Sequence, residues 1–267
     1  MTTSIRTAVA AALLAAPALA DGWALASNMS GPHDVDQAST GLLDGRFLVV
    51  GGLGEGDSTV ATAEVYDPVS ASWSMTPPMS VPRSGHTATL LASGRVLVAG
   101  GYDQMPCYPS CGVPVHDTAE VYDPATSSWT PTGDLMGARG GHTATLLPSG
   151  KVLLAGGFDS AVALATAEIY DPATGTFTPT GAMLSARYAH TATLLANGRV
   201  LVAGGFPSND APPYHALASA EVYDPQSGTW TATGSMHTGR MWHESLALDK
   251  LARWHTTTRL KASGIGC

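Results

Sequence analysis

Short apolar runs separated by turn residues make up most of the chain. The string HTATLLASGRVLVAGG, which begins at His86, contains two such runs joined by a Ser-Gly pair. Runs of this length, rich in Val, Leu and Thr and joined by Ser-Gly or Asn-Gly, predict β-hairpins. The string TAEVYDP, followed by a turn and then by a run such as SWTPTG, predicts a second hairpin. No stretch after residue 20 sustains the 3.6-residue apolar period of a helix, so only strands are expected.

The predicted strands recur as one module with four landmarks in a fixed order. An Arg three residues before a His comes first, followed by a glycine pair, a Tyr-Asp-Pro triplet, and an aromatic residue six positions after that Asp. The histidines are His86, His142, His190 and His243, preceded by Arg83, Arg139, Arg187 and Arg240. The glycine pairs begin at Gly51, Gly100, Gly156 and Gly204, the triplets at Tyr66, Tyr122, Tyr170 and Tyr223, and the aromatics are Trp73, Trp129, Phe177 and Trp230.

Residues that recur in every module are best explained by packing, which every module must achieve. A glutamate also recurs once per module, at Glu64, Glu120, Glu168 and Glu221. Two interpretations of it remain open: an ion pair with the recurring arginine between strands, or a solvated carboxylate on the outer face.

The order of paired glycines, tyrosine and tryptophan resembles the kelch repeat, and the resemblance covers residues 23 to about 248. It implies an all-β fold, a kelch-type β-propeller in which each repeat forms one four-stranded blade. The periodicity points the same way, because a lone four-stranded sheet leaves both faces uncovered and blades stacked around an axis cover them. We expect four full blades and a partial fifth.

The first twenty residues differ in kind from the rest. They carry one early positive charge at Arg6, then an apolar run, and they end in Ala18-Leu19-Ala20, a small-x-small pattern typical of signal-peptide cleavage sites. We therefore expect residues 1–20 to be a signal peptide cut after Ala20, with a secreted or periplasmic propeller over residues 21–248. An uncleaved N-terminal anchor is the alternative. After cleavage no membrane span is expected.

The two ends of the propeller region predict how the ring closes. Trp23 and Met29 repeat the six-residue step of Trp73 to Met79, so residues 23–29 have the pattern of a fourth strand that completes a blade begun at the C-terminus. That blade starts at His243, but residues 249–267 hold no glycine pair and no Tyr-Asp-Pro, an atypical tail. Either the fifth blade is degenerate, or the chain is a truncated or frame-shifted relative of a longer propeller; the abrupt break favours truncation. Association through the open blade edge is then expected.

Composition and net charge exclude some classes of binding partner. Apolar residues are 44% and charged residues 13%, as in a globular protein, and the net charge of −8 argues against nucleic acid or an anionic membrane. Cys107 and Cys111 lie in a Pro-rich segment and could form a disulfide in an oxidising compartment; this pair alone is weak evidence for zinc, and Cys267 has no obvious partner. We expect no metal and no cofactor, since the chain contains no HExxH, GxSxG or phosphate-binding glycine motif.

Binding is expected where the copies differ. The step from the second glycine of each pair to the next Tyr is 14, 21, 13 or 18 residues, so all insertions lie between the second and third strands of a blade. Since strands alternate in direction, these connections share one face with the connections between blades. The candidate ligand-binding residues in them are Asp103, Tyr108, His116, Asp159, Asn209, Asp210, Tyr214 and His215. Each could equally be an ordinary solvated loop residue.

These features favour a non-catalytic, exported binding module that recognises a protein or a glycan through the variable loops. One alternative is a carbohydrate oxidase fragment, since the fold also resembles the propeller domain of galactose oxidase-like copper enzymes. The segments RYAH and RMWH match that family's Arg-x-Tyr-His pattern only loosely, and its C-terminal domain has no counterpart here. A truncated, non-functional remnant is the other alternative.

Overall fold

The described part of the chain is built from antiparallel sheets. The computed structural model describes residues 29, 31, 36–54, 56, 58–103, 113–207 and 215–243. Sixteen strands in these ranges form four sheets of four strands each, and the ranges contain no α-helix. No helix in them is therefore long and apolar enough to cross a membrane. The predicted signal peptide (1–20), all of the predicted closing strand (23–29) except Met29, and the tail (249–267) lie outside the described residues.

Each sheet is one sequence module, and its strands pair in chain order. Blade 1 comprises β1 (Ala38–Gly41), β2 (Phe47–Val50), β3 (Ala63–Asp67) and β4 (Ser72–Met75). Blade 2 comprises β5 (Thr87–Leu90), β6 (Val96–Ala99), β7 (Ala119–Asp123) and β8 (Ser128–Pro131). Blade 3 comprises β9 (Thr143–Leu146), β10 (Val152–Ala155), β11 (Ala167–Asp171) and β12 (Thr176–Thr180). Blade 4 comprises β13 (Thr191–Leu194), β14 (Val200–Ala203), β15 (Ala220–Asp224) and β16 (Thr229–Ala232).

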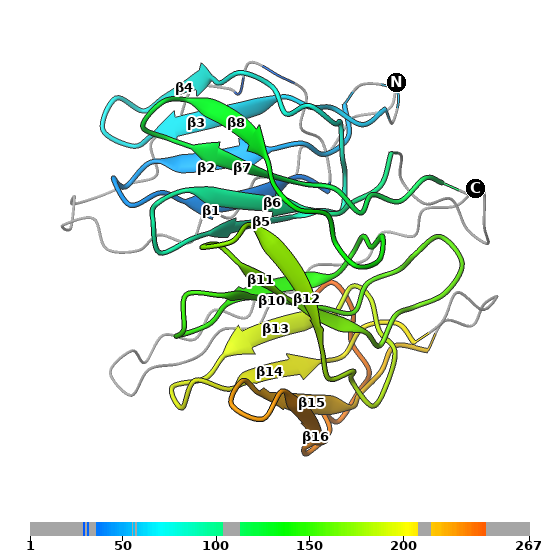
Figure 1. Ribbon diagram of the computed structural model, residues 1–267. Coiled ribbons are helices and arrows are strands. Elements are labelled where there is room, and N and C mark those ends of the chain that lie inside the picture. Colours follow the sequence, from blue (N-terminus) through cyan, green and yellow to red (C-terminus); the bar gives the residue numbers. More distant parts are fainter. Residues whose placement is uncertain are drawn as a thin grey trace, which may run out of the picture.

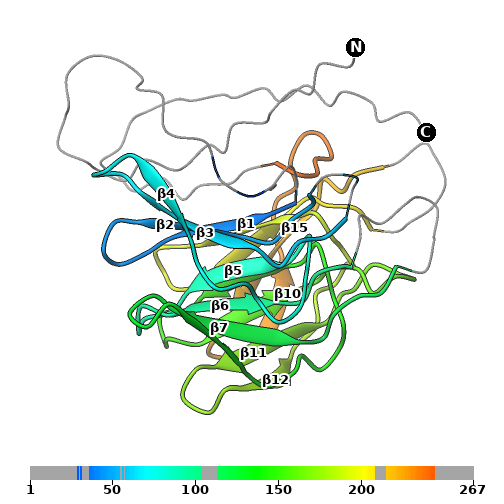
Figure 2. The same cartoon turned by 90° about the horizontal axis from the view of Figure 1, so that it is seen from above.

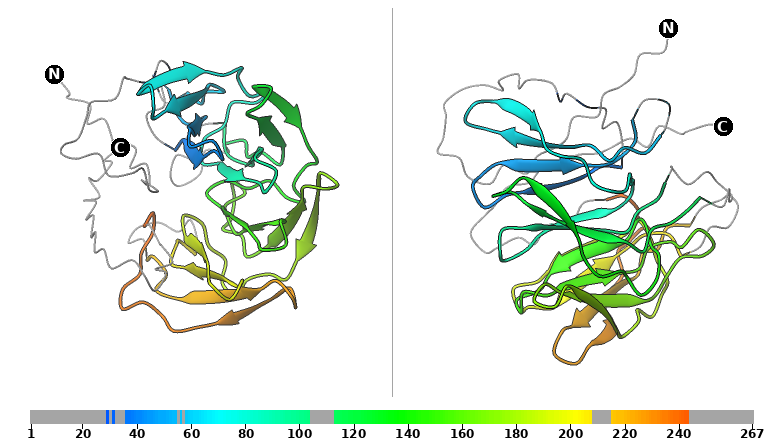
Figure 3. Two further views of the ribbon diagram at one scale, coloured as in Figure 1. Left: turned by 90° about the vertical axis from the view of Figure 1, so that its left-hand side faces the viewer. Right: turned by 45° about the horizontal axis from the view of Figure 1, so that its top comes forward.

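The blades fan out around a common centre. Figures 1 and 2 show the four sheets stacked face to face, and the left view of Figure 3 looks along the axis around which they turn. The first strands of neighbouring blades contact one another (β1 with β5, β5 with β9, β9 with β13), so they are the innermost strands. The expected β-propeller of four-stranded blades is confirmed.

Apolar side chains fill the space between neighbouring blades. Because successive side chains of a strand point to opposite faces, Leu97 and Ala99 of β6 face blade 3, where they meet Val152 and Leu154 of β10. The recurring aromatics complete this interface: the rings of Tyr170 and Phe177 lie 4.8 Å apart and belong to the same cluster. The modules therefore recur because each must fit the next one.

The glycine pair is required where the blades come closest to the axis. Gly100 and Gly101 both have positive φ, +65° and +106°. A Cβ on Gly100 would collide with the carbonyl oxygen of Arg139 in the next blade, and one on Gly101 would lie 2.7 Å from that of Ser84 in its own blade. The Gly101 N–H also donates to the Arg139 carbonyl at 2.9 Å. The first glycine thus makes room for Arg139 of the next blade, and the second makes room for Ser84, which precedes the first strand of the same blade.

The turn between the third and fourth strands offers a test of backbone strain. Blades 3 and 4 place Gly175 and Gly228 there at φ +68° and +67°, whereas blades 1 and 2 place Ala71 and Ser127 at φ +52° and +51°. A side chain in this left-handed region costs about 1 kcal/mol, so Ser127→Gly is expected to stabilise the protein by up to about 1 kcal/mol. Ser127 is exposed, so little packing is lost.

Urea unfolding monitored by circular dichroism measures this change. The reverse substitution in the neighbouring blade, Gly175→Ala, is the matched control and should destabilise by about 1 kcal/mol, since its Cβ would also lie 3.0 Å from the Thr132 hydroxyl. Equal stability of the two variants would show that the turn carries no strain.

Blades 1 and 4 each have one sheet face that no described blade covers. Leu201 and Ala203 of β14 are partly exposed, whereas Leu97 of β6 is 1% exposed and Ala99 fully buried. In blade 1, the carboxylate of Glu64 accepts a hydrogen bond from the Gly31 N–H at 2.6 Å. The carboxylate of Glu221 in blade 4 accepts an equivalent hydrogen bond from a backbone N–H of the connection before that blade. Association through the uncovered faces stays a prediction.

Candidate functional site

The propeller has two faces of different construction. We call the side that carries the connections between second and third strands, and those between blades, the loop face; the other side, which carries the turns inside the hairpins, is the hairpin face. The loop face includes residues 100–103, 113–118 and 156–166, so the described parts of these variable connections lie on one face, as the strand directions require.

Two of the candidate residues lie against each other. Nε2 of His116 lies 2.7 Å from Oδ1 of Asp103, across the base of the long connection in blade 2. Burial lowers the pKa of His116, as does the nearby charge of Arg83, while Asp103 opposes the shift. The imidazole is therefore largely neutral at pH 7. The Asp103 carbonyl also accepts a hydrogen bond from the Thr59 hydroxyl, which joins the loops of blades 1 and 2.

The other candidates are placed differently or not at all. The carboxylate of Asp159 accepts hydrogen bonds from the N–H groups of Ala161 and Val162 at 3.0 and 2.8 Å, so it shapes its own loop. His215 is exposed. The remaining predicted residues lie outside the described residues: Tyr108, Asn209, Asp210, Tyr214, Cys107 and Cys111.

An aromatic strip on the loop face was missed by the sequence analysis. The ring of Tyr188 lies 5.4 Å from those of both Phe158 and Phe206, and the Phe206 ring lies 5.5 Å from that of Trp242, edge to face. The sequence does contain a signal for this strip. The residue directly after the glycine pair is aromatic in three of the four blades: Tyr102, Phe158 and Phe206. We call Phe158, Tyr188, Phe206 and Trp242 the aromatic strip.

A line of backbone hydrogen bonds runs around the axis beside this strip. It joins the residues one position before each recurring histidine, with Asp36 at the equivalent position of blade 1: Asp36, Gly85, Gly141, Ala189 and Trp242. Each N–H donates to the carbonyl of the preceding member, at 3.0, 2.8, 2.9 and 3.0 Å. All of them have positive φ, from +43° to +61°. We call these residues the axis mouth.

Beneath the loop face, the recurring Arg and Glu form buried ion pairs. Arg83 pairs with Glu120 at 3.3 Å and Arg187 with Glu221 at 2.8 Å, and Arg139 pairs with Glu168 in the same way. The glutamates are at most 2% exposed. Of the two interpretations left open by the sequence, the ion pair with the recurring arginine is therefore correct, and the solvated carboxylate is wrong. The second carboxylate oxygen accepts a backbone N–H from the preceding connection, as Glu168 does from Met136 at 2.7 Å.

The recurring histidines also serve packing. His142 and His190 each place Nε2 3.0 Å from the threonine hydroxyl that begins the preceding blade, Thr87 or Thr143. His190 belongs to the RYAH segment and is buried against the axis like His142. Its environment is thus that of His142, the equivalent histidine of the preceding repeat. Among the described residues, no group of three or more His, Cys, Asp or Glu could hold a metal ion.

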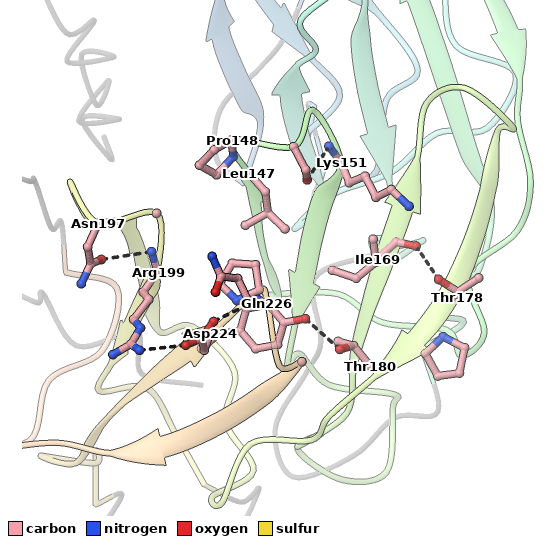
Figure 4. A pocket seen from close by; sticks show the side chains of 16 residues that line it. Leu147, Pro148, Lys151, Ile169, Thr178, Thr180, Asn197, Arg199, Asp224 and Gln226 are labelled. Atoms are coloured by element: carbon pink, nitrogen blue, oxygen red, sulfur yellow. Dashed lines mark hydrogen bonds and ion pairs between the residues drawn. The ribbon is translucent and has the colours of Figure 1, made fainter.

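A groove of about 880 Å³ lies between blades 3 and 4 on the hairpin face. Figure 4 shows Leu147 and Ile169 inside it, with Arg199 and Asp224 along one side. Its polar groups bond to one another: Arg199 pairs with Asp224 at 2.8 Å, and the Tyr223 hydroxyl lies 2.7 Å from that of Thr180. None of the predicted site residues lines it.

The family follows from the comparison with known proteins. Residues 38–252 match the model described as the KLHDC2/KLHL20/DRC7 Kelch-repeats domain. The chain belongs to the kelch-repeat family. Kelch-like protein 21 of Danio rerio is 36% identical over 75 residues, which are 28% of this chain and 11% of that protein. The F-box/kelch-repeat protein SKIP30 of Arabidopsis thaliana is 33% identical over 118 residues, 40% of this chain and 31% of that protein.

The matches to these kelch-repeat relatives thus span less than a third of the relatives' own length. The solved structure described as "Structure of YjhT" superposes with a TM-score of 0.69 at 16% identity, over 85% of this chain and 78% of that one. At that identity the likeness concerns the fold alone. Kelch-repeat domains are typically protein-interaction modules, which is the coarse functional class of this chain.

Proposed function

We propose that this kelch-repeat chain is a non-catalytic binding module, exported as residues 1–20 predict, that holds a protein partner on its loop face. The observation that carries the proposal is the placement of exposed apolar side chains. Met136, Val162, Leu184 and Trp242, all in connections of the loop face, are 65%, 56%, 66% and 69% exposed. Exposed apolar groups gathered on one side of a protein are typical of interaction surfaces.

The hairpin face offers a contrast. Its cationic side chains come from the starts of the second strands, and those of Lys151 and Arg199 are paired with aspartates at 2.9 and 2.8 Å. Its large exposed apolar residues in the described part are Leu43 and Val69, both in blade 1. The blade 2 to blade 4 side of the loop face is therefore the better candidate for a protein interface.

A protein partner fits this surface better than a glycan does. Glycan sites usually present open aromatic faces beside unsatisfied polar groups. Of the aromatic strip, Phe158 and Phe206 are 4% and 6% exposed and pack beneath the surface, whereas Trp242 is 69% exposed. The exposed aliphatic side chains of Met136 and Leu184 suit another protein's apolar residues.

The double substitution Met136→Asp with Leu184→Asp is expected to weaken partner binding by roughly tenfold or more. Both side chains are exposed, so the fold should be retained and the melting temperature nearly unchanged. The partner is first captured on the immobilised protein, identified by mass spectrometry and purified; its affinity for each variant is then measured by calorimetry.

Val69→Asp, at a 96% exposed position on the hairpin face, is the matched control and should bind like the unaltered protein. Equal affinity of the double variant, or a loss only in Val69→Asp, would contradict the proposal.

A further inference from the structure

The outermost strand of each blade ends its sheet, so one row of its backbone groups faces away from the blade. In blade 4 this strand is β16, at the lower edge of the fan in Figure 1. The Thr233 N–H donates to the Ala220 carbonyl at 3.0 Å, which continues the register of β15 and β16. Because backbone groups alternate in direction along a strand, those of Trp230 and Ala232 point outward. Neither N–H has a hydrogen-bond partner in the part of the chain that the structure describes.

Two of the four outer strands carry a proline at the equivalent outward position. The residue two positions after the recurring aromatic is Pro131 in β8 and Pro179 in β12, but Met75 in β4 and Ala232 in β16. A proline has no N–H to donate, so at a sheet edge it prevents a further strand from pairing there. The outer edges of blades 2 and 3 are therefore blocked at this position, whereas those of blades 1 and 4 are open.

The edge of β16 is better suited to strand pairing than that of β4. Residues 229–233 read Thr-Trp-Thr-Ala-Thr, whereas residues 72–76 read Ser-Trp-Ser-Met-Thr. Threonine is enriched in strands because its branched side chain fits a pleated surface. All of residues 229–233 except Trp230 are exposed. None of them is charged, so no like charges meet at this edge although the chain has a net charge of −8.

The strand is also complementary to itself. Two copies of β16 laid antiparallel about a two-fold axis at Thr231 bring Trp230 of each copy opposite Ala232 of the other. Each such pair exchanges two N–H···O=C hydrogen bonds, so the outward N–H groups of both copies are all used. Thr231 then faces its own counterpart, and opposed threonines are among the favourable cross-strand pairs.

We propose that the chain forms a two-fold dimer in which β16 pairs antiparallel with β16 of a second copy. The two four-stranded sheets of blade 4 then form one continuous sheet. A two-fold interface uses the same patch on both copies, so the assembly closes at two copies and grows no further. The dimer does not depend on the proposed function, which concerns the loop face.

The strand direction determines how this dimer presents its loop faces. β16 runs from the turn at residues 225–228, on the hairpin face, toward the connection on the loop face. Because the two copies of β16 run antiparallel, their loop faces point in opposite directions. The dimer thus joins two partner molecules on opposite sides and does not hold one partner twice. This consequence, unlike the dimer itself, rests on the proposed function.

Sedimentation velocity of the full chain at a series of concentrations tests the dimer. A pair of four-residue strands buries little surface, so a Kd of roughly 10–100 µM is expected. Ala232→Pro removes one outward N–H from each copy and should raise the Kd by roughly tenfold or more. Its melting temperature should be nearly unchanged, because β8 and β12 form with proline at the same position.

Met75→Pro makes the same change in the outer strand of blade 1 and is the matched control, which should leave the Kd unchanged. A chain that stays monomeric up to roughly 1 mM, or a dimer that persists in Ala232→Pro, overturns the proposal. Loss of the dimer in Met75→Pro alone also overturns it, since the interface is then β4.

A cysteine pair tests the register. In a chain whose three native cysteines are replaced by serine, Thr231→Cys should form a disulfide between copies on mild oxidation, seen on a non-reducing gel. Opposed residues of a non-hydrogen-bonded pair have Cα atoms about 4.5 Å apart, within the range of about 4.4–6.8 Å that a disulfide spans. Thr229→Cys, on the same face of β16, is the control: its counterpart is offset by about 13 Å along the strand, so no disulfide should form. Equal cross-linking of the two variants, or none in Thr231→Cys, overturns the proposed pairing.

Discussion

Substitution of Arg139 by methionine is expected to lower the free energy of unfolding by about 3–5 kcal/mol, the usual effect of breaking a buried ion pair. Its guanidinium is 2% exposed and pairs with Glu168, which is 1% exposed. It also donates to the carbonyls of Gly156 and Thr166, at 2.8 and 3.1 Å. Removal of the guanidinium leaves the glutamate charge and two carbonyls buried with fewer donors, and water cannot replace them without opening the blade.

Urea unfolding of the variant measures this loss. The control is Arg199→Met, which removes an ion pair with Asp224 on the hairpin face. The side chain of Arg199 is 52% exposed, so its loss should amount to less than about 1 kcal/mol. The double variant Arg139→Met with Glu168→Leu should regain part of the stability, because it no longer leaves a charge unpaired. A loss below 1 kcal/mol for Arg139→Met alone would mean that the pair is solvated, contrary to its burial.

The repeat allowed most of the fold to be predicted from the sequence. Strand pairs, glycine pairs and interblade aromatics each recur with a fixed spacing, and spacing is what determines strand register. The sequence could not decide whether Glu168 is buried, because an Arg–Glu pair and a solvated glutamate produce the same spacing. That decision depends on how closely the next blade approaches, which is a property of packing.

The candidate site was predicted less well for a physical reason. The length of a loop shows that it varies, not where its side chains point: Asp103 and His116 meet, whereas Asp159 turns back onto its own backbone. The axis mouth had no sequence signature at all. Its members share a backbone conformation and not a residue type, so Asp36 and Trp242 occupy positions held elsewhere by glycine or alanine.

The recurring histidines make the propeller sensitive to acid. His86, His142 and His190 are 6% or 7% exposed. Burial, followed by the charge of the arginine three residues earlier, lowers the pKa of His86 and of His190 to about 3, and lowers that of His142 well below its ordinary value. The folded protein therefore keeps these imidazoles neutral at pH values where the unfolded chain, with histidine pKa values of about 6.5, protonates them.

Stability is accordingly expected to be fully present above about pH 6.5 and to decrease as the pH falls toward about 3, because the unfolded chain binds more protons in this window. Each buried histidine contributes a slope of up to about 1.4 kcal/mol per pH unit, and the three together up to about 4. Urea unfolding at a series of pH values measures the slope. His142→Gln should reduce this slope by up to about 1.4 kcal/mol per pH unit, from whatever stability the variant has at pH 8. A slope that is the same in His142→Gln and the unaltered protein would show that His142 does not take up a proton on unfolding.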